Sequence, residues 1–315
     1  MYFTLIIPAY NEEEDIKYCI ESCLSQTYKK FELVIVNDGS TDKTESVIQS
    51  YILNYPKKSI KLYSISNSGR CHARNVAIKK SSYEILVFLN ADNILPSNFL
   101  EEIHKDFNNG YDSVSSMNKV KNMENLFARY IEMENSYKIF AGIYKRRVDE
   151  NKEKGVYWCE GFAVKKKFVL KGSLFPSKFD YKLEAGEDVR FVDELRSNGV
   201  KGAIRNDLFV KHIAPSKFKD FIRIRISRGS STPAIRYYVD NWSLSKIEIV
   251  AYLKLIKRTL ILLTIIPLLI ISLRNILFSN KNKFLDFFNF TFCWIVENFL
   301  ASYGEFKVLF KLKNK

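Results

Sequence analysis

Several motifs that mark nucleotide chemistry or hydrolysis are missing from these 315 residues. No Gly-x-Gly-x-x-Gly run occurs, which disfavours a dinucleotide-binding Rossmann domain. No Gly-x-x-x-x-Gly-Lys-Ser/Thr run occurs either, which excludes a P-loop kinase or ATPase. The Gly-x-Ser-x-Gly turn that anchors many serine hydrolases is also absent. Any chemistry must therefore come from residues outside these motifs.

Glycine and proline are scarce, at 12 and 7 residues, and no flexible linker or internal repeat stands out. The five cysteines are an odd number without zinc-type spacing, which predicts reduced thiols in a cytosolic compartment. No signal peptide is expected, because the apolar run Phe3–Pro8 is short and acidic residues follow at once. With 47% hydrophobic and 27% charged residues, the chain is neither disordered nor a polytopic membrane protein.

Acidic side chains are scarce in the last third of the chain. Residues 211–315 carry 18 basic and 6 acidic side chains, whereas residues 1–210 carry 31 and 29. The first part therefore resembles an ordinary soluble domain, and the last part suits an anionic partner such as a phosphate, acidic lipid or nucleic acid. Nucleic acid is disfavoured, because the charges flank apolar runs and not a base-stacking aromatic platform.

Charge-free runs long enough to cross a membrane are also lacking. Thr259–Leu273 would span only ~22 Å of the ~30 Å hydrocarbon core, and Phe284–Tyr303 is interrupted by Asp286 and Glu297. Three interpretations stay open: a short hairpin anchor, two helices lying in one leaflet, and a buried helix pair. The flanking basic residues favour membrane contact. In a hairpin, three basic residues lie in the connection and seven on the outer flanks, which predicts a cytoplasmic N-terminal domain.

Strand and helix signals alternate through the first hundred residues. Apolar runs predict strands at Phe3–Ile7, Phe31–Val36, Ile60–Ile65 and Ile85–Leu89, with helices between them. This alternation predicts βαβ units and a mainly parallel sheet, in which ligands bind beyond the carboxyl ends of the strands. Three polar clusters follow strands and are therefore candidate site residues: Pro8–Glu12, Asn37–Ser40 and Asn90–Asn93.

Beyond residue 100 the signals are more mixed. The pattern predicts a helix over 123–143, mixed strands over 155–170 and a helix over Glu187–Leu195 that opens with two acids. A further strand is predicted at Leu208–Lys211.

Five short motifs follow one another along the chain, and a less distinctive set of residues comes after them. The motifs are Thr4–Glu12, Ser25–Tyr28, Glu32–Asp42, Asn67–Asn75 and Phe88–Asn93, and the less distinctive set runs through Gly186–Asp188 to His212 and Arg228. Together they resemble the family 2 glycosyltransferases of the GT-A fold. The resemblance implies an α/β fold with a Rossmann-like mixed sheet flanked by helices. It implies a catalytic domain over 1–235, and the chain's own charge and apolar runs place a membrane-associated helical region over 236–315.

The resemblance also implies a binding site for a UDP- or GDP-sugar. Asp38 would accept a hydrogen bond from the base, residues nearby would frame the base and ribose, and Asp42 is expected to cap the next helix instead. Arg225 and Arg228 would belong to a mobile loop that closes over the diphosphate. The donor-binding candidates are Pro8, Tyr10, Glu12, Asp38, Arg74, Asn90, Ala91, Asp92, Arg225 and Arg228.

Asn90-Ala91-Asp92 stands where the family has Asp-x-Asp, whose hard oxygen ligands hold Mg²⁺ or Mn²⁺ on the diphosphate. Because Asn90 is an amide, Asp92 becomes the principal expected ligand, and the resemblance adds His212 to the metal or diphosphate site. Asn90 could still bind a ribose hydroxyl. This departure from the family pattern predicts weaker metal binding.

Asp188 occupies the position of the family's catalytic base, which removes the proton of the acceptor hydroxyl during an inverting transfer. The adjacent Glu187 would raise the pKa of either group, although an acidic pair also suits a helix N-terminus on electrostatic grounds alone. The acceptor side is expected at Trp158, Glu160 and Gly161, with core packing as the alternative for the tryptophan.

The predicted function is inverting transfer of a sugar from a UDP- or GDP-sugar to a membrane-linked acceptor such as a lipid-linked glycan. The protein would lie at the cell membrane with its catalytic domain facing the cytoplasm. The processive signature Gln-x-x-Arg-Trp is absent, since Gly229 follows Arg228, which favours one sugar per encounter. A polyprenyl-phosphate sugar synthase and a non-catalytic nucleotide-sugar-binding protein stay open as alternatives.

Overall fold

The computed structural model describes the chain apart from residues 141–158, 172–173, 178–182, 184, 280–281 and 315, and apart from a few side chains. It divides into two compact units. The first comprises Met1–Lys119, Tyr144–Lys182 and Glu187–Ile213, and the second comprises Val120–Ile143, Leu183–Gly186 and Ala214–Lys315. This division differs from the predicted limit at residue 235, because the second unit also takes in α5 (Leu126–Phe140) and α8 (Phe218–Tyr238).

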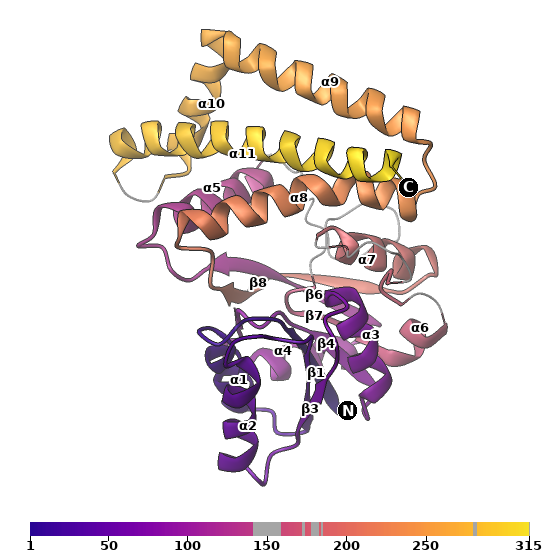
Figure 1. Cartoon of the computed structure of the whole chain (residues 1–315). Coiled ribbons are helices and arrows are strands. Elements are labelled where there is room, and N and C mark those ends of the chain that lie inside the picture. The colour runs from indigo at the N-terminus through magenta and orange to yellow at the C-terminus, as the bar shows by residue number, and fades with distance from the viewer. Residues whose placement is uncertain (141–158, 172–173, 178–182, 184, 280–281, 315) are drawn as a thin grey trace. The chain divides into compact units, whose positions relative to one another are not determined.

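The first unit is built on one mixed sheet of eight described strands in the order β3-β2-β1-β4-β7-β6-β8-β5 (Figure 1). The parallel half contains β3, β2, β1 and β4, whereas β7 runs antiparallel to both β4 and β6, and β5 runs antiparallel to β8. The strands are β1 Phe3–Ala9, β2 Phe31–Asn37, β3 Ile60–Ser64, β4 Ile85–Phe88, β5 Asn93–Ile94, β6 Ser113–Val120, β7 Phe162–Lys165 and β8 Gly202–His212.

The register of the parallel strands brings their carboxyl ends to one edge. Ile6 of β1 lies level with Val34 of β2 and with Phe88 of β4. The polar segments that follow these three strands therefore meet at that edge. All four strands predicted in the first hundred residues are confirmed. The prediction of strands alone over 155–170 is wrong in part, because β7 is followed at once by a short helix, α6 (Lys166–Lys171).

Helices cover both faces of this sheet (Figure 1). On one face, α1 (Ile16–Leu24), α2 (Thr44–Asn54) and α4 (Phe99–Asn108) pack on Phe3, Leu5 and Ile7, which alternate along β1 and therefore point to the same side of the sheet. On the other face, α3 (Arg70–Lys80) contacts β1 and β2. The last helix of the unit, α7, spans Glu187–Ser197.

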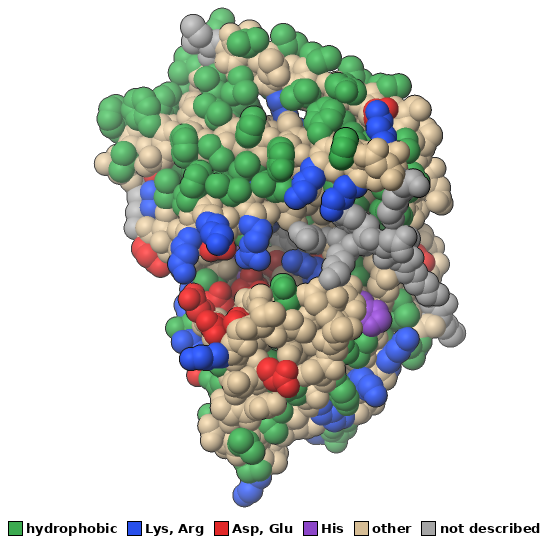
Figure 2. Space-filling view, viewed as in Figure 1, with side chains coloured by type: hydrophobic (Ala, Val, Ile, Leu, Met, Phe, Trp, Pro, Cys, Tyr) green, Lys and Arg blue, Asp and Glu red, His purple; other side chains and the backbone are tan. Residues whose placement is uncertain are grey.

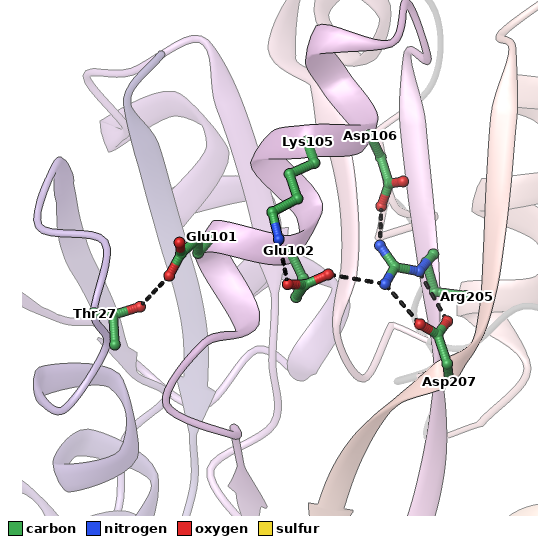
Figure 3. A network of polar contacts seen from close by, with 7 residues as sticks. All are labelled: Thr27, Glu101, Glu102, Lys105, Asp106, Arg205 and Asp207. Carbon is green, nitrogen blue, oxygen red and sulfur yellow. Dashed lines mark hydrogen bonds and ion pairs between the residues drawn. The ribbon is translucent and has the colours of Figure 1, made fainter.

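A charged network fastens α4 to β8 (Figure 3). The guanidinium of Arg205 donates to Glu102 at 3.0 Å and to Asp106 at 2.9 Å on α4, and to its own strand neighbour Asp207 at 2.7 Å. Hydrogen bonds from Lys105 and Arg205 lower the pKa of Glu102, so this carboxylate stays charged and paired. The network fixes the antiparallel half of the sheet against its helix.

The second unit is helical and is organised around α11 (Lys283–Lys313), which contacts α5, α8, α9 (Leu244–Leu263) and α10 (Ile265–Leu277). Glycines let α8 and α11 approach closely. A Cβ atom on Gly229 would lie 2.3 Å from the carbonyl oxygen of Ala301, and one on Gly304 would lie 2.3 Å from that of Ile226. Neither backbone carbonyl can move aside easily, so both positions require glycine.

Each acid within α11 is paired with an arginine of another helix. The pairs are Asp286 with Arg129 at 2.9 Å, Glu297 with Arg225 at 3.1 Å and Glu305 with Arg258 at 2.8 Å. Removing one partner of such a pair would leave a buried charge, which is costly. The acids that interrupt the apolar sequence are thus neutralised by neighbouring helices, and α11 continues unbroken for 31 residues.

The outer faces of α9, α10 and α11 are apolar (Figure 2). Leu263, Leu277 and Phe284 are 76%, 74% and 76% exposed. Among the described residues, α11 is long and apolar enough to cross a membrane by length and composition, and α9 with Leu268–Leu277 passes the same test as a pair bent by 85°. The sequence alone predicted no run long enough to cross a membrane. The acids in α11 are paired with side chains of other helices, and the helix continues to Lys313, and neither feature can be recognised from the local sequence.

Candidate functional site

The turn after β2 is held against the loop before α3. Asp38 accepts hydrogen bonds from the backbone nitrogens of Ser68 at 2.7 Å and Gly69 at 2.8 Å. Gly39 has φ +69°, and a Cβ atom there would lie 2.7 Å from the nitrogen of Asn67. Each carboxylate oxygen of Asp38 keeps a second lone pair. Its role as acceptor from a nucleotide base therefore stays a prediction.

The donor candidates from the first motif lie at the end of β1. Pro8 is inside the strand, Tyr10 follows it and is exposed, and the backbone nitrogen of Glu12 donates to the hydroxyl of Thr44 at 2.7 Å. Asp42 accepts from the backbone nitrogen of Thr44, the first residue of α2, at 3.0 Å. Asp42 thus bonds the first turn of α2, although Lys43 and not Asp42 is the N-cap residue of that helix. Donor binding by Pro8, Tyr10 and Glu12 stays a prediction.

Arg74 lies beneath the sheet edge, with 1% of its surface exposed. Its Nη1 donates to Glu187 at 2.8 Å, its Nη2 donates to Asn90 at 2.8 Å, and its guanidinium lies 5.0 Å from the ring centroid of Phe175. The charge is therefore paired, hydrogen-bonded and stacked within the protein. The donor-binding role predicted for Arg74 stays a prediction, and the contacts assign the side chain to joining α3, α7 and the end of β4.

Glu160 and Gly161, predicted on the acceptor side, lie between β4 and β6. The Glu160 carboxylate accepts from the amide of Asn90 at 3.2 Å and from the amide of Asn118. Gly161 has φ +77°, and a Cβ atom there would lie 2.2 Å from the hydroxyl of Ser116, so only glycine fits. Trp158 lies outside the described residues.

Asp188 lies in the first turn of α7 and is partly buried. Burial and the neighbouring Glu187 raise the pKa of Asp188 to about 6, although Arg74 and the backbone nitrogen of Val189 act in the opposite direction. The Val189 nitrogen donates to its Oδ1 at 2.9 Å. A carboxylate with this pKa is a stronger base than an ordinary aspartate and is still ionised near neutral pH.

Asp92 lies directly before β5, where Asn93 is level with His212 of β8. Burial and Glu160 raise the pKa of Asp92 to about 6, and His212 lowers it in part. The Nδ1 of His212 is buried without a hydrogen-bond partner among the described residues. Ala91 is buried beside them.

A divalent cation that is held mainly by a diphosphate needs only one or two protein ligands. Asp92 and His212 fit that demand, since a carboxylate with a raised pKa and an unpartnered imidazole nitrogen both favour a cation. In the part of the chain that the structure describes, no group of three His, Cys, Asp or Glu side chains forms a self-sufficient metal cage.

The sequence comparison decides the family. Residues 4–172 match the family model described as Glycosyl transferase family 2. The chain belongs to this family.

Among curated relatives of this family 2 transferase, a teichoic acid poly(glycerol phosphate) polymerase of Staphylococcus epidermidis is 39% identical over 106 residues, which are 34% of the chain and 15% of that protein. In eight of the curated relatives, the matched segment makes up 14% to 39% of the relative's length. The relationship thus concerns a shared segment and not the whole length of either protein.

Two solved structures resemble the transferase. The mannosyltransferase PcManGT of Pyrobaculum calidifontis, in complex with GDP-Man and Mn²⁺, gives a TM-score of 0.56 at 21% identity and covers 73% of this chain and 61% of that chain. S. aureus TarS 1–349 in complex with UDP-GlcNAc gives a TM-score of 0.52 at 18% identity and covers 72% and 66%. The predicted fold, a mixed sheet flanked by helices of the GT-A type, is confirmed.

The loop predicted around Arg225 and Arg228 is wrong, because both residues lie within α8 of the transferase. Gly229, which follows Arg228, is required where α8 crosses α11. Arg225 is 3% exposed and pairs with Glu297, whereas Arg228 is exposed. Their contact with a donor stays a prediction.

Sequence reasoning missed Asn118 and Phe175. Asn118 contacts Glu160 across 42 residues of sequence, and Phe175 stacks on Arg74 across about a hundred. Neither belongs to a local motif, and their partners are set by strand order alone. A buried amide within the otherwise ordinary strand β6 was the one available signal.

Proposed function

We propose that this family 2 transferase is an inverting glycosyltransferase that moves a sugar from a UDP- or GDP-sugar to a membrane-linked glycan. The observation that carries the proposal is Asp188, a partly buried carboxylate whose pKa is raised to about 6. Glu187 beside it is tied through Arg74 to Asn90 at the end of β4, so the base and the donor-side strand are held in one geometry.

The chemistry follows from a single carboxylate on the acceptor side. Asp188 removes the proton of the acceptor hydroxyl while that oxygen attacks the anomeric carbon opposite the nucleoside diphosphate, which leaves with its bonding electrons. One displacement inverts the anomeric centre and needs no covalent intermediate. Pro8, Tyr10, Glu12 and Asp38 are the proposed contacts to the nucleoside.

Asp92 and His212 are the residues proposed to hold Mg²⁺ or Mn²⁺. The cation, when bound, neutralises charge that develops on the departing diphosphate. Support comes from the unpartnered imidazole nitrogen of His212 and from the raised pKa of Asp92. PcManGT, which shares the fold, is described with Mn²⁺.

The membrane-linked acceptor is supported by the second unit. Apolar side chains of α9, α10 and α11 face outward, and residues 211–315 carry three basic side chains for each acidic one. Such a surface suits a bilayer with anionic headgroups, which would bring the transferase to a lipid-linked glycan. The name of the S. epidermidis relative also refers to a teichoic acid polymer. We place the protein at the cell membrane with its first unit in the cytoplasm.

The test is a donor panel on full-length protein in detergent or nanodiscs. UDP- and GDP-sugars are supplied with Mg²⁺ or Mn²⁺, and release of the nucleoside diphosphate is measured with a lipid-linked glycan extract, with a polyprenyl phosphate and without acceptor. Turnover that depends on the glycan supports the proposal. Turnover with polyprenyl phosphate alone would make the protein a polyprenyl-phosphate sugar synthase. Tight donor binding without any turnover would make it a nucleotide-sugar-binding protein.

A further inference from the structure

Asn90 uses both ends of its amide. Its Oδ1 accepts from Arg74 at 2.8 Å, and its Nδ2 donates to Glu160 at 3.2 Å. An amide accepts at one end and donates at the other without any change of protonation state. An ionised aspartate could accept from Arg74 but would present a second carboxylate to Glu160.

Glu160 is equally committed. One carboxylate oxygen receives Asn90 and the other receives the amide of Asn118. Asn118 is 8% exposed, and its Oδ1 is buried with no hydrogen-bond partner among the described residues. Asn118 can therefore turn its amide over and accept a hydrogen bond in place of donating one.

We propose that Asn90 is a positioning residue whose amide is required by Glu160, so that the identities of residues 90 and 160 are coupled. The inference rests on the proposed function. The chain Arg74–Asn90–Glu160–Asn118 then fixes the end of β4 and, two residues later, the donor-side carboxylate Asp92. Position 90 in the Asn-Ala-Asp segment is thus an amide because Glu160 needs a hydrogen-bond donor there.

An exchange of the two groups provides the test. N90D alone sets two carboxylates against each other. In N90D/E160Q the new amide donates to the new carboxylate and accepts from Asn118, so every hydrogen bond returns with the net charge and volume unchanged. E160Q alone is expected to unfold at a temperature close to that of wild type, because the Asn118 amide can turn over and accept a hydrogen bond from the new amide.

The measurements are the unfolding temperature of the unliganded full-length protein and the affinity for UDP or GDP with Mn²⁺. N90D is expected to bind the nucleotide roughly 10-fold more weakly, because the free energy of leaving a buried polar group without a matching partner corresponds to about a 10-fold change in a dissociation constant. It is also expected to unfold at a lower temperature than wild type. N90D/E160Q is expected to regain both, to within about 3-fold in affinity. The exposed Asn54, changed to Asp, is the matched control and should match wild type.

Two results would overturn the inference. One is an N90D/E160Q protein no better than N90D in either measurement. The other is an N90D protein that binds UDP or GDP with Mn²⁺ more tightly than wild type, which would make position 90 a metal-ligand position. If wild type binds neither nucleotide, the proposed function fails, while the unfolding temperatures of wild type, N90D, E160Q and N90D/E160Q still decide the coupling.

Discussion

At the scale of single residues, the site gathers carboxylates that would be costly to ionise together. The pKa values of Asp92 and Asp188 are both raised to about 6, chiefly by burial and then by the acids Glu160 and Glu187 respectively. Arg74 offsets part of this repulsion at Asp188 and His212 offsets part of it at Asp92. Carboxylates with such pKa values suit the two proposed roles, the base at Asp188 and the cation ligand at Asp92.

Asp188→Asn should lower the rate of transfer by about 10²–10⁴, the usual contribution of a general base, and leave UDP or GDP affinity within a few-fold of wild type. The wild-type rate at limiting acceptor should rise with pH through about 6, as Asp188 loses its proton. Both are measured by release of nucleoside diphosphate between pH 5 and 8. Parallel losses of affinity and rate would reassign Asp188 to donor or metal binding.

The same variant has a predicted effect on stability. A carboxyl whose folded pKa is about 6, above an ordinary value of 3.8, binds more protons in the folded than in the unfolded state between those pH values. Stability therefore falls as pH rises from about 4 to 6. Asp188→Asn removes this loss, so the variant should melt at a higher temperature than wild type at pH 7. Thermal melts at pH 4 should bring the two proteins together, and a lower melting temperature at pH 7 would contradict the expectation.

At the scale of secondary-structure elements, the crossing of α8 and α11 depends on glycine. Gly304 faces the carbonyl of Ile226 and the nitrogen of Ser230, and Gly229 faces Ala301. The hydroxyl of Ser230 also donates to the carbonyl of Gly304 at 3.2 Å. At this crossing the two helices therefore contact each other through their backbones and a hydrogen bond, and not through interlocking side chains.

Gly304→Ala should destabilise the protein by about 1–3 kcal/mol, despite the better helix propensity of alanine, because the added methyl group meets a backbone carbonyl. The measurement is chemical or thermal unfolding of the full chain in detergent. Ser245→Ala, at an exposed position of α9, is the control and should change stability by less than about 0.5 kcal/mol. A stabilised Gly304→Ala protein would mean that the helices are further apart.

At the scale of the whole molecule, the second unit is one packed body and not an appended anchor. Tyr130 of α5 and Phe221 of α8 are buried with Phe290 and Cys293 of α11. A chain ended near residue 240 would expose this core, so solubility after truncation would say little about membranes. Point substitutions on the outer faces of the full chain are the sharper experiment.

Leu263→Gln, Ile270→Gln and Leu277→Gln combined should lower the fraction of protein that sediments with vesicles containing anionic lipid by at least about 10-fold, because these exposed side chains supply apolar burial. The matched control is Leu53→Gln, an exposed leucine of the first unit. High salt should release wild type only in part, since salt screens headgroup attraction but not apolar burial. Equal sedimentation of the triple variant and wild type would contradict a membrane role for these faces.

The sequence by itself determined the parallel half of the sheet and the family. Local apolar runs predict the strands between Phe3 and Phe88, and polar residues at the strand ends predict the turns that follow them. Both signals depend only on residues that are neighbours in the sequence. The position of Asp188 at the start of a helix was predictable for the same reason.

Tertiary structure alone decided what surrounds those residues. Arg74 became buried, Asn90 became a bridge to Glu160, and Arg225 joined a helix pair, because each partner lies tens of residues or more away along the chain. The acids of α11 likewise look like interruptions until arginines from other helices pair with them. Buried charges and amides choose partners by strand order and helix packing, and local sequence carries no record of either.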